Sequence, residues 1–70
     1  MKQLLLLLII GYLGLHNGQL ALFESGKSVP DAVLPYRAEL FPETDQKALQ
    51  KGIPFSSESE LNHLMEDFLS

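Results

Sequence analysis

The sequence predicts a small α+β domain, in which a short antiparallel sheet packs against two helices. Three observations favour this fold class: a turn signal at Asn17-Gly18 between two apolar segments, a helix closed by Gly52, and a helix capping box that starts at Ser57. The 70 residues suffice for one domain, and no cysteine is present to cross-link it. So small a domain is marginally stable alone, and we expect a partner, a second copy or a membrane to supply further packing.

The chain opens with Lys2 and an uncharged run from Gln3 to Leu15, the pattern of a secretory signal or a membrane anchor. No Ala-x-Ala-like cleavage site follows, and the run is shorter than the roughly 20 residues that span a bilayer. A strand over Leu4 to Ile10 is the alternative. We assign residues 1–11 to a hydrophobic targeting or anchoring segment and residues 12–70 to the domain.

Asn17-Gly18 is the preferred pair for a two-residue type I′ turn, because both residues need a positive φ. The turn predicts a hairpin over residues 12–23, in which Tyr12 pairs with Phe23. One face of this hairpin is aliphatic, with Leu13, Leu15, Leu20 and Leu22. The other face combines apolar and polar side chains: Tyr12, Ala21, Phe23, His16 and Gln19. Because both faces carry large apolar side chains, both need cover.

Pro30 and Pro35 interrupt the apolar stretch that follows, so no central strand is expected there. Residues 29–40 are predicted to cross the molecule as one short edge strand or a single helical turn. The candidates for burial in this segment are Val33, Leu34, Tyr36 and Leu40.

Two helices are predicted, over about residues 42–51 and 58–69. Pro42 is tolerated in the first turn of the first helix, and Gly52 supplies the left-handed residue that ends it. Ser57 and Glu60 form a Ser-x-x-Glu capping box before the second helix. The apolar positions of the second helix follow a helical period and form one stripe: Leu61, Leu64, Met65, Phe68 and Leu69.

No residue pattern indicates catalysis, a cofactor or a metal site. His63 lies near several acids on the second helix, but it is interpreted as an exposed helix residue, and His16 as a surface residue beside the turn. The net charge is −4, and seven of the nine acids lie in residues 39–70. This charge disfavours binding to nucleic acid, so a neutral or basic protein surface is the expected partner.

The order of these motifs resembles the C-terminal domain of the bypass-of-forespore C family, which has short relatives in spore-forming Gram-positive bacteria. The segments that carry the resemblance, within roughly Tyr12 to Ser70, are Asn17-Gly18 with Ala21-Leu22-Phe23, Pro42-Glu43-Thr44-Asp45, Leu49 through Phe55, and Glu60 through Phe68. The resemblance implies a short antiparallel sheet with packed helices. It also implies an extracytoplasmic regulatory role, since the full-length family protein restrains a serine peptidase in signalling between forespore and mother cell. The family's N-terminal domain is absent from the matching segments, and no catalytic residue is implied.

The leading hypothesis is a non-enzymatic extracytoplasmic interaction module, secreted or membrane-anchored, that regulates sporulation signalling by binding another protein, such as a membrane-associated or secreted peptidase. A homodimer through the hairpin edges is a further possibility. The alternative is a small membrane-active or membrane-structural protein that acts through residues 3–15; a cytoplasmic location remains open if Leu4 to Ile10 packs in the core. The candidate partner surface combines the aliphatic hairpin face with the last helix: Leu13, Leu15, Leu20, Leu22, Phe23, Leu64 and Phe68.

Overall fold

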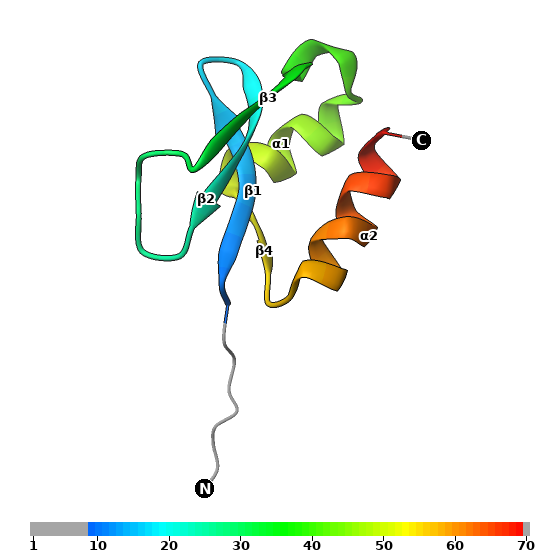
Figure 1. The fold of residues 1–70 in the computed structure, drawn as a ribbon. Coiled ribbons are helices and arrows are strands. Elements are labelled where there is room, and N and C mark those ends of the chain that lie inside the picture. Colours follow the sequence, from blue (N-terminus) through cyan, green and yellow to red (C-terminus); the bar gives the residue numbers. More distant parts are fainter. Residues whose placement is uncertain (1–8, 70) are drawn as a thin grey trace, which may run out of the picture.

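A computed structural model describes residues 9–69 and contains a four-stranded antiparallel sheet with two α-helices (Figure 1), which confirms the α+β class. The strands are β1 (Gly11–His16), β2 (Gln19–Glu24), β3 (Ala32–Arg37) and β4 (Ile53–Phe55). The helices are α1 (Glu43–Lys51) and α2 (Glu58–Leu69), and a 3-10 turn, η1, covers Ala38–Leu40. The strand order is β3-β2-β1-β4, so β1 and β2 are the inner strands.

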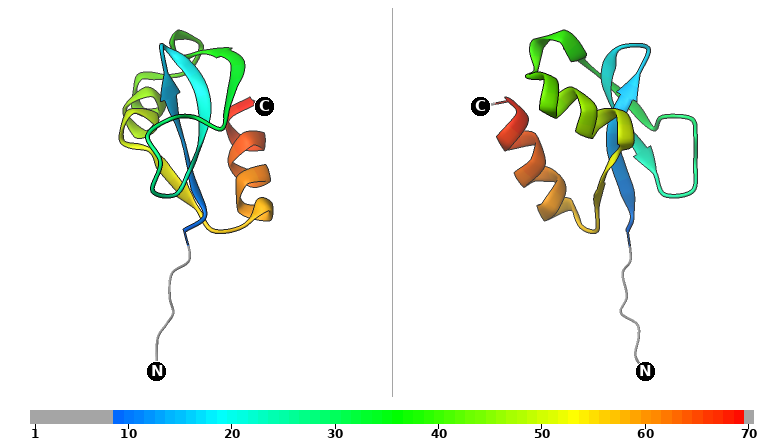
Figure 2. Two further views of the ribbon diagram at one scale, coloured as in Figure 1. Left: turned by 60° about the vertical axis from the view of Figure 1, so that its left-hand side comes forward. Right: turned by 180° about the vertical axis from the view of Figure 1, so that it is seen from behind.

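The molecule has two layers, the sheet and the two helices, and the last turn of α1 lies beside β1, where it also borders the opposite face of the sheet (Figures 1 and 2). The core between the layers contains Leu13, Leu20, Phe41 and Leu49, from β1, β2, the segment before α1, and α1 itself. Partly buried side chains surround this cluster: Leu15, Leu22, Leu34, Tyr36, Ile53, Leu64, Met65 and Phe68. One contiguous core therefore holds every element except the loops.

The predicted hairpin and its register are confirmed. Asn17 and Gly18 have φ values of 52° and 79°, the positive φ values that a type I′ turn requires. Tyr12 pairs with Phe23, and His16 with Gln19. The turn therefore determines which side chains share a face.

The segment after the hairpin forms both of the structures considered for it, an edge strand and a single turn of 3-10 helix. The side-chain amide of Gln19 donates to the carbonyl of Leu34 at 3.3 Å and ties β3 to β2. Leu34 and Tyr36 pack against the core, but Val33 and Leu40 are 45% and 70% exposed. Their predicted burial was wrong, because Val33 lies on the side of the sheet away from the helices and Leu40 ends the 3-10 turn.

Both ends of α1 depend on residues identified in the sequence, with small differences. Pro42 precedes the helix instead of starting it, and its carbonyl accepts the first helical hydrogen bond, from Gln46 N at 2.9 Å. Gly52 has the predicted positive φ (91°), but its ψ of 123° is extended rather than helical. The predicted left-handed helical conformation of Gly52 was therefore wrong, because only φ has the expected sign. This geometry leads the chain directly from α1 into β4.

The capping box of α2 is confirmed on one side and altered on the other. Glu60 N donates to Ser57 Oγ at 3.1 Å, as the motif predicts. The carboxylate of Glu60 accepts two hydrogen bonds from Ser56, one from the backbone N at 2.7 Å and one from Oγ at 3.0 Å. The motif predicts a different donor, the backbone N of Ser57. Farther along α2, the ring of Phe68 meets the ring of Phe41 edge-on, with centroids 5.6 Å apart.

The fourth strand is absent from the sequence-based interpretation. Ile53, Pro54 and Phe55 pair with Leu13, Tyr12 and Gly11, respectively. Both edge strands contain a proline, Pro35 in β3 and Pro54 in β4.

The targeting or anchoring assignment for residues 1–11 rests mainly on residues 1–8, which lie outside the described part of the chain, so it stays a prediction. Strand β1 begins at Gly11, and the preceding Ile10 N donates to the carbonyl of Phe55 at 3.0 Å. Across residues 9–69, neither helix combines the length and the apolar character needed to cross a bilayer.

Candidate functional site

The aliphatic hairpin face, predicted as the partner surface, is the inner face of the sheet. Leu13 and Leu20 have no exposed surface, so a partner cannot reach them in this structure. Leu15 and Leu22 are partly buried around the same core. The helices close the space over these leucines, so the region between the hairpin and α2 is part of the core.

Two other residues predicted for the partner surface also serve this packing. Leu64 and Phe68 lie on the side of α2 that faces the sheet. Both are partly buried and pack against the core cluster. Phe23 differs from the other six residues, because the hairpin register puts it on the opposite side of the sheet.

That opposite side is here called the outer face, and the last turn of α1 borders it beside β1. Residues that pair across antiparallel strands point to the same face, so the register identifies its members. Six of them form two rows across the sheet, Phe23-Tyr12-Pro54 and Val33-Ala21-Gly14, and a third row is polar, Arg37-Gln19-His16. None of the six carries a charge. The apolar side chains that reach the surface of the outer face are therefore those of Tyr12, Phe23, Val33 and Pro54, because Gly14 and Ala21 are buried.

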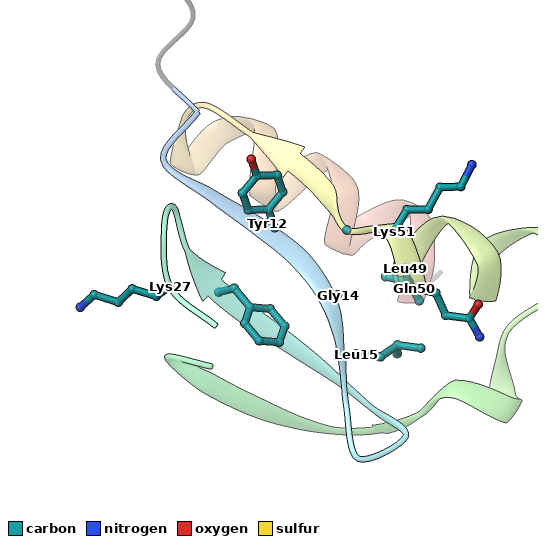
Figure 3. Close-up of a pocket in the computed structure, with 9 residues that line it drawn as sticks. Tyr12, Gly14, Leu15, Lys27, Leu49, Gln50 and Lys51 are labelled. Atoms are coloured by element: carbon teal, nitrogen blue, oxygen red, sulfur yellow. The ribbon is translucent and has the colours of Figure 1, made fainter. Parts of the chain in front are cut away.

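The outer face is hollowed beside β1, and the hollow has a volume of about 390 Å³. Its lining comes from β1, β2, the loop after β2 and the end of α1: Tyr12, Gly14, Leu15, Phe23, Lys27, Leu49, Gln50, Lys51 and Gly52. Figure 3 shows Tyr12 and Gly14 along β1, with Lys27 on one side of the strand and Lys51 on the other. The hollow therefore combines an aromatic floor with a cation at either side.

The charged side chains of the lining are lysines, and no carboxylate belongs to it. Lys27 Nζ lies 2.8 Å from Glu24 Oε1. The hydrogen bond and charge of Glu24 raise the pKa of Lys27, and those of Lys27 lower the pKa of Glu24. Lys51 forms no ion pair with a residue of the described range 9–69. This side of an acidic chain thus presents positive charge.

The two histidines lie outside the lining of the hollow. His63 Nδ1 lies 3.9 Å from Glu66 Oε1, and both side chains are more than three-quarters exposed. In the part of the chain that the structure describes, no three His, Cys, Asp or Glu side chains are grouped to hold a metal ion. His16, beside the turn at the end of β1, lies outside the hollow lining.

Sequence reasoning placed Tyr12, Ala21 and Phe23 on one hairpin face but did not select that face as the surface. The missing information was which face the helices cover. Gly14 and the residues at the end of α1 were also missed, because their positions depend on contacts between distant segments. The one available signal was the pairing of two aromatic residues, Tyr12 and Phe23, on the same face.

Comparison of the chain with curated proteins, and with solved structures, gave no match. Comparison with protein-family models matched residues 9–70 to the BofC C-terminal domain. The match begins at Ile9, two residues before β1, and includes all four strands and both helices. The resemblance inferred from the order of the motifs is therefore confirmed. This chain belongs to the family of the BofC C-terminal domain.

Proposed function

We propose that this chain is a non-enzymatic interaction module that works outside the cytoplasm and regulates another protein during spore formation. The observation that carries the proposal is the outer face, where Val33 and Pro54 are exposed and Tyr12 and Phe23 are partly exposed around the buried Gly14 and Ala21. Contiguous apolar surface on a small domain is typical of a protein interaction site. Membership of the BofC family supports the link to spore formation.

The N-terminal sequence supports a location outside the cytoplasm. Lys2 and the uncharged run from Gln3 have the charge order of an export signal. The domain includes the end of this run, since β1 begins at Gly11. A secreted form and a membrane-anchored form are both compatible with this arrangement, because the outer face belongs to the domain and not to the run.

The lining of the hollow supports a binding role over a catalytic one. Its polar side chains are those of Tyr12, Lys27, Gln50 and Lys51, without a histidine, serine or carboxylate. A nucleophile with a neighbouring general base is therefore missing from this lining. The alternative activity through residues 3–15 is less well supported, because Gly11 to Leu15 belong to an inner strand of the sheet.

Site-specific photocross-linking in the host cell tests the interaction role. A benzoylphenylalanine at Val33, which is 45% exposed on the outer face, should cross-link to a distinct protein during spore formation. The matched control carries the same residue at Leu69, which is 39% exposed on α2, on the other side of the sheet. Equal products from both positions, or none from Val33 at any stage, would contradict the interaction role.

The location is tested separately. Protease added to intact spheroplasts should digest a C-terminal tag on this chain, and a carbonate wash should distinguish an anchored form from a secreted one. A protected tag would place the domain in the cytoplasm and overturn the extracytoplasmic part of the proposal.

A further inference from the structure

The floor of the hollow is suited to a large apolar side chain. Tyr12 and Phe23 are directly paired across β1 and β2, and both rings border the hollow. Gly14 separates the ring of Phe23 from the last turn of α1: a Cβ on this residue would lie 3.3 Å from Phe23 Cε1 and 3.3 Å from the Leu49 carbonyl oxygen. The absence of a side chain at Gly14 thus lets the ring of Phe23 lie over β1, where it borders the hollow together with Tyr12.

The rim of the hollow is suited to a negative charge. Lys51 stands at its edge without an ion pair to the described residues, and Lys27 shares its charge with Glu24 on the other side. The chain has a net charge of −4, so most of its surface repels anions. An apolar group with a single adjacent carboxylate would match both the aromatic floor and the lysine rim.

Two observations favour a peptide over other carriers of this chemistry. The net charge of −4 disfavours polyanions such as nucleic acid or an anionic bilayer, because an extended polyanion would also meet the acids of the chain outside the hollow. The volume of about 390 Å³ is near the lower end of the roughly 300–1,000 Å³ of ligand sites, so it suits one side chain with its neighbouring residues.

A second copy of this chain is a poorer occupant. Its segment Asp67-Phe68 has the right chemistry, but the ring of Phe68 packs against Phe41. Leu40 is exposed next to Glu39, yet the carboxylate of Glu39 already pairs with Arg37 at 3.0 Å. Each segment would have to give up an existing contact in order to bind.

We propose that the hollow binds a peptide segment of a partner protein in which an aromatic or large aliphatic side chain adjoins a carboxylate. The side chain lies against Tyr12 and Phe23, and the carboxylate faces Lys51. The proposal rests on the proposed interaction function and specifies the chemistry of the partner.

The test measures fluorescence polarisation of rhodamine-labelled Gly-Glu-Phe-Glu-amide with the full chain in phosphatidylcholine nanodiscs. Gly-Glu-Ala-Glu-amide lacks the ring and should bind about 10-fold more weakly, the loss expected when one aromatic contact is removed. Gly-Lys-Phe-Lys-amide retains the ring with the opposite charge and should also bind more weakly. Equal affinities for the three peptides would overturn the proposal, as would equal binding of Gly-Glu-Phe-Glu-amide to empty nanodiscs.

A pair of lysine variants locates the binding on the protein. Lys51→Gln should weaken binding of Gly-Glu-Phe-Glu-amide by about 3-fold, the usual size of an exposed ion pair. Lys47→Gln removes the same charge one helical turn earlier, at a residue outside the lining, and should leave the affinity unchanged. Thermal unfolding of both variants checks that α1 remains intact. Equal weakening by both changes would contradict binding in the hollow.

Self-association is measured in the same samples by native mass spectrometry without peptide. A dimer that Lys51→Gln dissociates would overturn the proposal and identify a second copy as the occupant. Failure of the peptide test, with cross-linking from Val33 retained, would reject only the acidic-apolar chemistry. Loss of the cross-link would reject the interaction function itself, whatever the peptides show.

Discussion

The ring of Phe23 on β2 covers Gly14 on the neighbouring strand β1. A Cβ on Gly14 would lie 3.3 and 3.5 Å from Cε1 and Cδ1 of Phe23. Glycine weakens a strand because it has no side chain to pack, and an aromatic ring from the next strand compensates for this loss. The pair thus stabilises an inner strand and shapes the hollow on the outer face.

Replacement of Gly14 by alanine should lower the free energy of unfolding by about 1 kcal/mol. The added methyl group would crowd the Leu49 carbonyl and the Phe23 ring, which destabilises the fold by about 1–3 kcal/mol. Alanine also reduces the conformational freedom of the unfolded chain, which stabilises the fold by about 0.4–1 kcal/mol. Urea unfolding measures the change.

Gly11→Ala is the informative comparison, because its Cβ would lie only 2.6 Å from the Phe23 carbonyl oxygen and 2.8 Å from Phe55 Cζ. The backbone must then shift, so this variant should be the less stable of the two. The packing argument would fail if Gly14→Ala were as stable as the wild type, or if Gly11→Ala were the milder change.

The turn between β1 and β2 gives a second prediction. Gly18 has a φ of 79° and nothing within 4 Å of its would-be Cβ, so a substitution there meets strain without a clash. Gly18→Ala should cost about 1–2 kcal/mol, whereas Gly18→Asn should cost less, because asparagine tolerates positive φ. Denaturant midpoints of the two variants provide the measurement, and equal losses would argue against a conformational cause.

The hairpin and the two helices could be predicted because their signals are local. Asn17-Gly18 specifies a turn whose register follows from the chain itself, and Ser57 and Gly52 mark helix ends through hydrogen bonds to nearby backbone. Strand β4 could not be predicted in this way. Its three residues contain a proline and have no usable period, and they become a strand only through pairing with Leu13, Tyr12 and Gly11.

The same distinction explains why the sequence led to the leucine face as the candidate partner surface. Local alternation correctly sorted the side chains of the hairpin into two faces, with Leu13 on one and Phe23 on the other. Both faces were apolar, so the hairpin sequence gave no reason to prefer either as the core. The choice is made by α1 and α2, whose Leu49 and Leu64 pack on the leucine face.

A third prediction concerns the attachment of α2. This helix has no fully buried residue, and its inward side chains include Phe68, which meets Phe41 at an interplanar angle of 85°. Changing each phenylalanine to leucine, singly and together, should reveal a coupling of about 0.5–1.5 kcal/mol, the usual value for an aromatic pair. Strictly additive losses in urea unfolding would show that the edge-on contact adds nothing to ordinary burial.

Hydrogen exchange should distinguish the stabilities of α2 and the sheet. Because α2 contributes only partly buried side chains, its amides should exchange faster than those of β1, which pairs with a strand on each side. Phe68→Leu should accelerate exchange in α2 more than in β1. Uniform acceleration would instead mean that the domain opens only as a single unit.

The cap of α2 predicts an acid-dependent contribution to stability. Hydrogen bonds from the backbone and side chain of Ser56 lower the pKa of Glu60 from its ordinary value of 4.5. A carboxyl group whose pKa is lower in the folded state stabilises the fold above its unfolded pKa, and this contribution disappears as the pH falls through the folded pKa. The wild type should therefore lose stability relative to Glu60→Gln when the pH is lowered from above 4.5 to below it.

The comparison with Glu60→Gln isolates this residue, because Glu24 and Glu39 also have lowered pKa values and lose their contributions in the same range. Parallel stability curves for the two proteins would show that the Ser56 contacts do not favour the ionised form. Circular dichroism during urea unfolding at several pH values gives the necessary curves.

The prolines of the two edge strands reduce the pairing of these strands with edge strands of other copies of the domain. Phe55 turns its carbonyl toward β1, where it accepts from Ile10 N, so the alternation of the backbone directs the nitrogen of Pro54 outward. That nitrogen has no hydrogen to offer, and β3 is interrupted by Pro35. A strand from another molecule therefore meets an incomplete row of donors at β4. Crowded copies of this apolar domain are thereby hindered from growing into fibrils by strand addition.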